Sequence, residues 1–447
     1  MAERNSSTTN FNITNFVREE SLAGILLIAV TIAALIWANS AYYEEYHYLW
    51  HELKAGFVFG DFSLVTSLHH WINDGLMAIF FFAIGLEIKR EVLAGELSTL
   101  KKASLPIFAA IGGMLVPALI YTFVNSGDPE FAKGWGIPMA TDIAFALGLL
   151  SLLGNKVNIN LKIFLTALAI ADDLGAILII AIFYTETIEI MELVYAGFFL
   201  SVLFIANRMG VRRTTFYAIV GLLGVWSSFL YSGVHATIAG VLIAMTIPVR
   251  PKVRENDFID GLSRLLDKFK RERPNDSTLL TEKQSHLIND ICKLSDDSNT
   301  PLQKLEHALH PVVAYFILPV FAISNAGIHV EGNILSLVFH PISIGIIAGL
   351  LFGKFIGITL FSLLAVKAKW ATLPSGVTWK QIYGVGFLAG IGFTMSIFIS
   401  DLAFVSDEYV QIAKVGIIVD SVIAAIIGMA ILTWKSKTKK TEQNKTK

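Results

Sequence analysis

The chain has 447 residues, of which 54% are hydrophobic and only 16% are charged. This composition excludes an ordinary soluble domain and predicts a polytopic membrane protein. A formal net charge of −1 gives no indication of nucleic-acid binding, and the single cysteine, Cys292, excludes an internal disulfide framework.

A polar tail over residues 1–20 precedes the first apolar segment. Ala38-Asn39-Ser40, at the end of this segment, resembles a signal-peptidase site. The apolar run is about 18 residues long, however, and it follows the acidic Glu19 and Glu20 in place of a basic leader. We therefore interpret the run as a retained membrane span.

Apolar segments recur along residues 21–435 and predict about twelve transmembrane helices. The segments are Leu22–Ala38, Trp71–Ile88, Leu105–Phe123, Trp135–Leu153, Leu161–Tyr184, Leu193–Ile205, Phe216–Phe229, Gly233–Ile247, Leu309–Ala326, Ile342–Val366, Ile382–Ile399 and Val410–Trp434. The chain is therefore predicted to be an all-α, multi-pass membrane protein.

Basic residues are concentrated in alternate connections. One set of loops carries Lys89, Arg90, Lys101, Lys102, Lys156, Arg208, Arg212, Arg213, Lys367, Lys369 and Lys380. The opposite set carries little more than Lys54, Lys133 and the border residue Lys414. The positive-inside rule places the first set in the cytoplasm, and an even number of spans places both termini there. The basic tail over residues 436–447 agrees with this orientation.

The outer loop over residues 39–68 contains a candidate β-hairpin. Aromatic and β-branched residues between Ala55 and Thr66 flank Gly60-Asp61, a pair that suits a two-residue type II′ turn. An isolated two-stranded hairpin is marginal in water, so we expect it to pair with its copy in a second subunit. An interfacial loop lying on lipid is the alternative.

Residues 250–303 form a long hydrophilic segment. Apolar residues at helical spacing predict two amphipathic helices on the cytoplasmic face, separated by Pro274–Ser277. A solvated insertion is the simpler interpretation, and a regulatory role is the alternative.

Two adjacent acids stand in the middle of the fifth span. Asp172 and Asp173 are the twelfth and thirteenth residues of Leu161–Tyr184, which is 24 residues long. Each central Asp costs about 2.5–3.5 kcal/mol on insertion scales, so the pair predicts a role within the fold; neutralisation for packing alone is the alternative. Carboxylates in such a place hold either a proton or a small hard cation. This competition can couple two ion fluxes.

Other polar residues lie at similar depth. Pro138 interrupts span four before Thr141 and Asp142, and span eleven carries four glycines from Gly384 to Gly392. Paired interruptions of this kind indicate a transporter's midplane site, although close helix packing is an equal explanation of the glycines.

Spans ten and twelve also contain charged residues. Lys354 is the only interior charge of span ten, so we predict an ion pair with Asp172 or Asp173, which either neutralises the acid or takes part in the ion cycle. Asp420 lies near the middle of span twelve. If spans three to five and ten to twelve are inverted repeats, Asp420 is placed much as the aspartate pair is.

A second group of titratable residues lies at cytoplasmic helix ends. It comprises Glu87, Glu91, Glu306, His307 and His310. These residues can form a cluster that titrates near neutral pH, or they can simply be solvated. For His235, packing is the more common role, and function is the alternative.

Long motifs resemble the NhaA family of bacterial sodium/proton antiporters. They are WINDGLMAIFFFAIGLEIKRE, GWGIPMATDIAFALG, ALAIADDLGAI, SGVHATIAGV, LEHALHPVVAYFILPVFAISNAG, GLLFGKFIGITLF and LAGIGFTMSIFI. The resemblance implies inverted repeats with crossed, discontinuous helices four and eleven, an architecture of which this family is a known example. It implies electrogenic, pH-regulated exchange of Na⁺, and of Li⁺, for protons by a secondary transporter of the inner membrane that needs no cofactor.

The resemblance also assigns residues. It implies that Asp173, Asp172 and Thr141 bind the cation, with Asp142 nearby, and that Lys354 pairs with an aspartate. The implied pH-response residues are Glu87, Arg90, Glu91, Glu306 and His307, to which we add His235. The hairpin is implied to join a homodimer. The long segment over residues 250–303 and Asp420 depart from the family pattern, so their roles are not carried over.

Two rival functions also use charged groups within a membrane. An intramembrane aspartyl protease has membrane aspartates that activate water, but it would be expected to carry them on separate helices with a Gly-x-Gly-Asp signature, which is absent. A channel would conduct ions without exchange, and gradients imposed across proteoliposomes would distinguish it from an antiporter.

Overall fold

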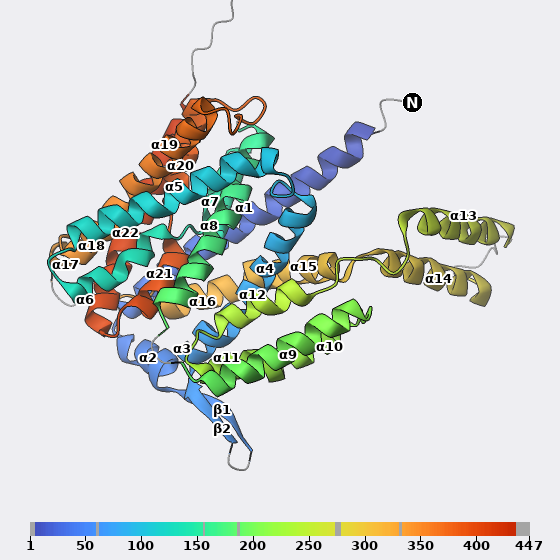
Figure 1. Ribbon diagram of the computed structural model, residues 1–447, viewed down its shortest axis with the longest axis horizontal. Coiled ribbons are helices and arrows are strands. Elements are labelled where there is room, and N and C mark those ends of the chain that lie inside the picture. Colours follow the sequence, from blue (N-terminus) through green and yellow to red (C-terminus); the bar gives the residue numbers. More distant parts are fainter. Residues whose placement is uncertain are drawn as a thin grey trace, which may run out of the picture. The chain divides into compact units, whose positions relative to one another are not determined.

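A computed structural model of the chain is shown in Figure 1. It describes residues 5–59, 62–154, 157–185, 188–272, 279–329 and 333–434. Four predicted features lie outside these residues: Lys156, the turn Gly60-Asp61, the linker Pro274–Ser277 and the tail over residues 436–447.

Helices of membrane-spanning length dominate the described chain. Eight stretches are long and apolar enough to cross a bilayer: Leu68–Ala94, Leu100–Val124, Ile159–Phe183, Ile190–Arg208, Thr214–Ser232, Pro301–Asn325, Pro341–Lys367 and Asp407–Thr433. Two bent helix pairs and two shorter apolar helices, Leu22–Ala38 and Thr237–Thr246, account for the other predicted spans. The all-α polytopic fold is therefore confirmed.

The chain divides into two compact units. One unit draws on the described residues of 1–77, 91–186 and 313–447, and the other on those of 78–90 and 187–312. In the order of the chain, the helices of the first unit begin with α1 (Asn5–Ala38), α2 (Tyr43–His47), η1 (Tyr48–Glu52), α3 (Leu68–His70) and η2 (Trp71–Leu76). They continue with α5 (Leu100–Val124), α6 (Pro129–Ala132), η3 (Lys133–Met139), α7 (Ile143–Leu152) and α8 (Ile159–Phe183). The last part of this unit contains η6 (Val313–Ile317), α16 (Leu318–Asn325), α17 (Ile334–Val338), α18 (Pro341–Ile347), η7 (Ala348–Gly353), α19 (Lys354–Lys367), α20 (Trp379–Leu388), α21 (Phe393–Ala403) and α22 (Asp407–Thr433).

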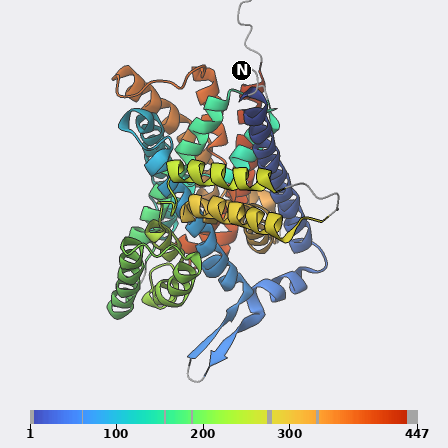
Figure 2. The same ribbon diagram turned by 90° about the vertical axis from the view of Figure 1, so that its right-hand side faces the viewer.

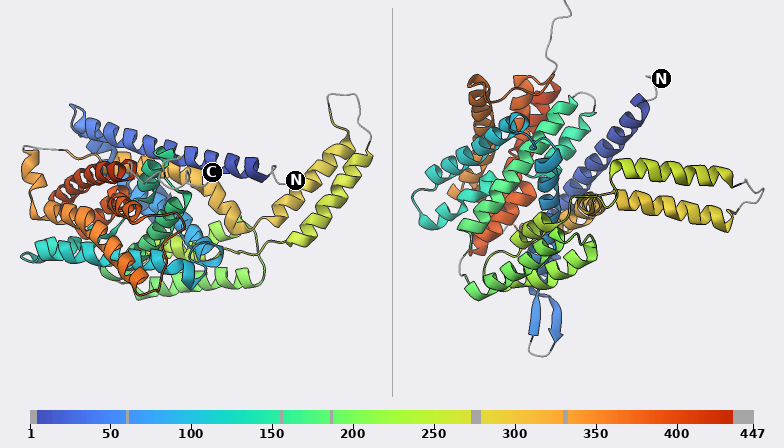
Figure 3. Two further views of the ribbon diagram at one scale, coloured as in Figure 1. Left: turned by 90° about the horizontal axis from the view of Figure 1, so that it is seen from above. Right: turned by 45° about the vertical axis from the view of Figure 1, so that its right-hand side comes forward.

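The second unit holds most of α4 (Met77–Ala94) and the middle of the chain. Its further helices are α9 (Ile190–Arg208), α10 (Thr214–Val220), η5 (Gly221–Trp226), α11 (Ser227–Ser232), α12 (Thr237–Thr246), α13 (Glu255–Arg271), α14 (Glu282–Ser298) and α15 (Pro301–Val312). The amphipathic helices α13 and α14 lie side by side in two different views (Figures 2 and 3). They coincide with the two helices predicted within residues 250–303.

Close helix packing positions the tenth span in the first unit. Helices α5 and α19 approach so closely that a Cβ on Gly357 would collide with the carbonyl oxygen of Gly112. Only a residue without a side chain allows this approach, and small residues at such contacts are the usual device of packed membrane helices. A π-helical turn, η7, comes directly before Lys354. Turns of this type often occur at functional sites.

The helix of the first span begins earlier than the sequence analysis predicted. Helix α1 begins at Asn5, so the described part of the predicted tail is helical and continuous with the first span. No Pro or Gly interrupts residues 5–22, and nothing in the sequence therefore stops the helix there.

The hairpin consists of β1 (Lys54–Phe59) and β2 (Phe62–Ser67), which pair antiparallel with Lys54 opposite Ser67 and Phe59 opposite Phe62.

Candidate ion-binding site at two helix breaks

Spans four and eleven are both interrupted, as the sequence predicted. Helices η3 and α7 meet at a bend of 43°, and α20 and α21 meet at a bend of 46°. Pro138 lies just before the first break and lacks an amide hydrogen for a helical bond. At the second break, Gly390 packs so that a Cβ would lie 2.7 Å from the Leu350 carbonyl oxygen. The glycines of span eleven therefore occur both at an interruption of the helix and at a close packing contact, as the two interpretations proposed.

The two breaks contact each other directly. The amide of Asp142 donates to the carbonyl oxygen of Ile391 at 2.7 Å. The Thr141 hydroxyl donates to the carbonyl oxygen of Ala389 at 2.8 Å. In the other direction, the Ser396 hydroxyl donates to the carbonyl oxygen of Ile137 at 2.9 Å. Buried backbone groups that the interruptions remove from helical bonding thus find partners across the junction.

Asp142 caps two half-helices at this junction. Its Oδ1 accepts the amide of Phe145 in α7 at 2.9 Å, and its Oδ2 accepts the amide of Thr394 in α21 at 3.1 Å. The Thr394 hydroxyl also donates to Oδ2, at 2.5 Å. Both half-helices begin here, and a carboxylate stabilises the partial positive charge of helix N-termini. Asp142 is therefore well placed to hold the junction together.

Asp172 forms the predicted ion pair with Lys354. The two side chains have no exposed surface, and Lys354 Nζ lies 2.5 Å from Asp172 Oδ2. The same oxygen accepts the hydroxyl of Thr141 at 2.9 Å. The other oxygen, Oδ1, is buried and accepts no hydrogen bond from the described residues. It faces Gly113 of α5, where even a Cβ would come no closer than 3.7 Å.

Asp173 is the neighbour of this ion pair on α8 and is only 1% exposed. Asp172 and Asp173 thus place two adjacent buried carboxyl groups beside the junction. A small hard cation prefers oxygen ligands, and Asp172, Asp173 and Thr141 supply them. No group of three or more His, Cys, Asp or Glu side chains that could hold a metal occurs among the described residues. A cation here would therefore complete its shell with hydroxyls, carbonyls or water.

The predicted pH-response residues include one ion pair. In the second unit, Arg90 Nη1 lies 2.5 Å from Glu306 Oε1, which joins α4 to α15. Glu91 accepts the amide of Glu96 at 2.9 Å. His307 is exposed, whereas His235 lies in the connection between α11 and α12, where its carbonyl oxygen accepts the amide of Ile238. The described contacts thus establish one ion pair within this set.

The first unit contains a polar network that the sequence analysis missed. Asp401 of α21 pairs with Lys414 of α22 at 2.9 Å, and the Asn73 amide donates to Asp401 at 3.3 Å. His69 lies 2.8 Å from the Asn325 side-chain oxygen. Its ring lies 4.6 Å from that of His51. Burial, together with the nearby positive charges of His69 and Lys414, lowers the pKa of His51 to about 4. The opposite charges of Asp401 and Lys414, which lie on consecutive spans, could have indicated this ion pair in the sequence.

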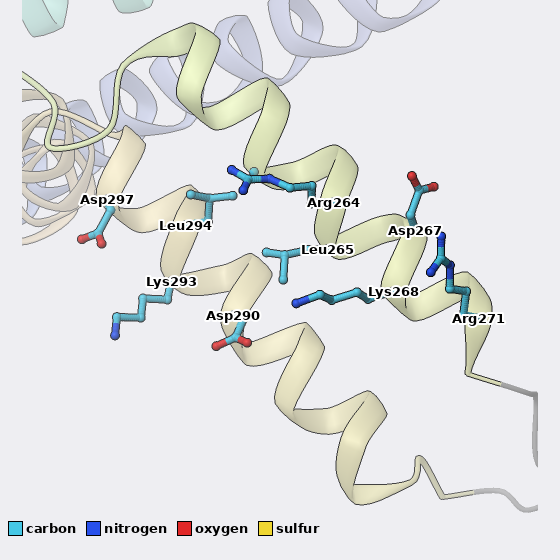
Figure 4. A pocket seen from close by; sticks show the side chains of 10 residues that line it. Arg264, Leu265, Asp267, Lys268, Arg271, Asp290, Lys293, Leu294 and Asp297 are labelled. Carbon is cyan, nitrogen blue, oxygen red and sulfur yellow. The ribbon is translucent and has the colours of Figure 1, made fainter.

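A separate groove of about 580 Å³ lies between α13 and α14. Figure 4 shows Leu265 and Leu294 between the two helices, with charged side chains around them. The groove contains none of the predicted site residues. We therefore interpret it as the solvated seam of an amphipathic helix pair.

Comparisons with known proteins identify a family for this chain. Residues 14–432 match the family described as Na+/H+ antiporter 1. The Na(+)/H(+) antiporter NhaA of Oleidesulfovibrio alaskensis is 51% identical over 418 residues, which cover 93% of this chain and 92% of the relative. The Na(+)/H(+) antiporter NhaA of Wolinella succinogenes is 48% identical over 432 residues, which cover 96% of this chain and 94% of the relative.

Proposed function

Because this chain belongs to the Na⁺/H⁺ antiporter family, we propose that it exchanges Na⁺ for protons at the buried carboxylates Asp172 and Asp173. The chain is a secondary transporter and not an enzyme, and its many spans agree with a multi-pass protein of the bacterial inner membrane. The observation that carries the proposed site is the pair of buried acids beside the junction of the two breaks, of which Asp172 pairs with Lys354.

Competition for the same oxygens would couple the two ions. Asp173 and the uncommitted Oδ1 of Asp172 can bind Na⁺ only while they are ionised, and a proton on either acid removes that charge. Thr141 contributes a hydroxyl oxygen that already touches Asp172. Li⁺ is a hard cation of the same charge and binds to the same oxygens. Two acids can release two protons for one bound Na⁺, which makes the exchange electrogenic.

Lys354 compensates Asp172 whenever that acid is ionised. Its ammonium group is buried and lies 2.5 Å from Asp172, so the pair is held together in a setting of low dielectric constant. Asp173 is the adjacent buried carboxyl on α8 and can bind the cation together with Asp172. We assign Asp173 as the principal exchange group and Lys354 as the residue that positions Asp172.

We extend the proposal to pH regulation through a group at the cytoplasmic helix ends, namely Glu87, Arg90, Glu91, Glu306 and His307, and through His235, which lies apart from this group. The Arg90–Glu306 ion pair supports this assignment, because protonation of Glu306 in acid would weaken the link between α4 and α15. We also propose that both termini lie in the cytoplasm, on the basis of the loop charges.

We propose, in addition, a homodimer within membrane lipid. The two-stranded sheet of β1 and β2 leaves outer strand edges whose backbone groups can pair with another strand. A twofold partner would satisfy these groups with the same surface on both subunits.

The test is Na⁺-driven proton movement in proteoliposomes that carry a pH-sensitive dye. Asp173→Asn should abolish the proton signal, because an amide cannot exchange a proton for a cation. Asp407→Asn, an equivalent change at an exposed position, should leave exchange unchanged. Full exchange by purified Asp173→Asn would refute the assignment. Sodium flux without proton movement in the unmodified protein would indicate a channel instead.

A further inference from the structure

Asp420 is a buried carboxyl that the proposed exchange site does not use. It lies near the middle of α22 and has no exposed surface. Neither of its oxygens has a hydrogen-bond partner among the described residues. This situation contrasts with Asp142, both of whose oxygens accept hydrogen bonds, and with Asp172, whose Oδ2 accepts one from Thr141.

Asp420 stands at the level of the second helix break. The hydroxyl of its neighbour Ser421 accepts the amide of Phe393, the first residue of α21, at 3.3 Å. Gly416, one helical turn earlier on the face of Asp420, packs so that a Cβ would lie 2.9 Å from the Cα of Ser343 in α18. Asp420 therefore belongs to a tightly packed face of α22 beside the junction.

The charged and titratable groups on the elements around Asp420 are engaged elsewhere. Two of the basic groups form ion pairs: Lys354 pairs with Asp172, and Lys414 pairs with Asp401 of α21. In α20, Lys380 donates to the carbonyl oxygen of Trp434, and the ring of Tyr383 packs against that of Phe355. His340 caps the N-terminus of α18, and Asp142 accepts a hydrogen bond from Thr394. Asp407 and Glu408 lie at the exposed start of α22. No described cation thus compensates a charge on Asp420.

The chemistry of this position favours a proton over a metal ion. A buried carboxylate with neither a cation nor a hydrogen bond is strongly destabilised, and protonation removes the charge. A metal ion would need several oxygen ligands, whereas the hydroxyl of the adjacent residue Ser421 already accepts a backbone amide. A proton needs a single oxygen.

We propose that Asp420 is a separate proton-binding site that takes up and releases one proton in each transport cycle, in addition to the protons exchanged at Asp172 and Asp173. This inference rests on the exchange mechanism proposed above. Alternating access in such folds moves repeats around a fixed site, and Ser421 ties α22 to the break that takes part in this movement. An O–H bond forms at Asp420 with a proton from the water on one side. The bond breaks when the rearranged junction admits water from the other side.

The test is the number of protons exchanged per Na⁺. In proteoliposomes with a fixed Na⁺ gradient, the proton gradient and membrane potential at which net exchange stops report this ratio. Asp420→Asn should lower the ratio by one proton, Asp420→Glu should retain it, and Asp407→Asn should leave it unchanged. An unchanged ratio in Asp420→Asn would overturn the proposal and leave Asp420 as a permanently neutral residue.

A second measurement applies even if Asp420→Asn does not transport. The infrared difference spectrum between acid and alkaline purified protein should contain a carboxyl carbonyl band that disappears in this variant. The absence of any difference between variant and unmodified protein would contradict a titrating Asp420. Failure of the exchange site itself is distinguishable, because it would appear as retained exchange in Asp173→Asn, whatever the result at Asp420.

Discussion

Replacement of Lys354 by methionine should separate the structural role of the buried ion pair from its role in transport. Lys354→Met keeps the length of the side chain but removes the charge that faces Asp172 across 2.5 Å. Both partners have no exposed surface, and removal of one partner from a buried pair destabilises a protein by about 3–5 kcal/mol. Thr141 still donates to Asp172, and a hydrogen bond to a charged group contributes roughly 1.5–3 kcal/mol. We therefore expect a loss of stability near the lower end of the first range, about 3 kcal/mol.

The assay is the thermal unfolding midpoint of the purified protein in detergent. Lys367→Met, at the exposed end of the same helix, provides the matched control and should shift stability by no more than about 0.5 kcal/mol. The double variant Asp172→Asn with Lys354→Met removes both charges and should recover most of the lost stability. The double-mutant cycle then isolates the coupling between the two residues. If Lys354→Met unfolds like the unmodified protein, or if the double variant is no more stable than the single one, the argument from an uncompensated buried charge is wrong.

Three further predictions concern assembly and pH. Deletion of residues 55–66 should lower the dimer fraction measured by native mass spectrometry while the monomer still transports; an unchanged dimer fraction would place the contact on another surface. Acidification should raise the apparent KM for Na⁺, because protons and Na⁺ compete for Asp173, and a KM that does not move with pH would contradict competition. Any loss of rate that survives saturating Na⁺ would belong to the Arg90–Glu306 region. The pKa of His51 is about 4 in the folded chain and 6.5 without its surroundings, so the unfolded chain binds more protons between these values. The contribution of His51 to the free energy of unfolding is therefore present above pH 6.5 and is lost as the pH falls towards 4. In the His51→Gln variant, the thermal unfolding midpoint should depend less on pH between these two values.

The spans and the polar residues inside them could be predicted from the sequence, because apolar length and isolated charges are local properties. The partner of Lys354 was left open between Asp172 and Asp173, since adjacent residues on a helix share a depth and differ only in direction. The structure settles that choice by the Lys354–Asp172 distance.

The contacts that join the two helix breaks could not be predicted. The hydrogen bond from the Asp142 amide to the Ile391 carbonyl oxygen joins residues whose spans are far apart in the chain. It connects backbone groups, so neither residue type predicts it. Asp401 and Lys414 were similarly hidden, because each looks like an ordinary border residue until the two helices are placed together. Residue type and spacing thus identify candidate participants, whereas their pairing depends on the packing of the helices.

The reciprocal hydrogen bonds between the two helix breaks have a consequence for the speed of the protein. Asp142, Thr141 and Ser396 each donate a hydrogen bond to the opposite break, so neither break can shift without exposing polar groups of both. Breaking these three hydrogen bonds at the same moment would leave three donors and three acceptors unpaired. At about 1–3 kcal/mol for each buried group, the activation barrier would rise by roughly 6–18 kcal/mol if no water replaced the bonds. The turnover rate should accordingly depend steeply on temperature and on how readily water enters the junction. Hydration of the moving backbone, rather than ion binding, would then be the rate-limiting step of the transport cycle.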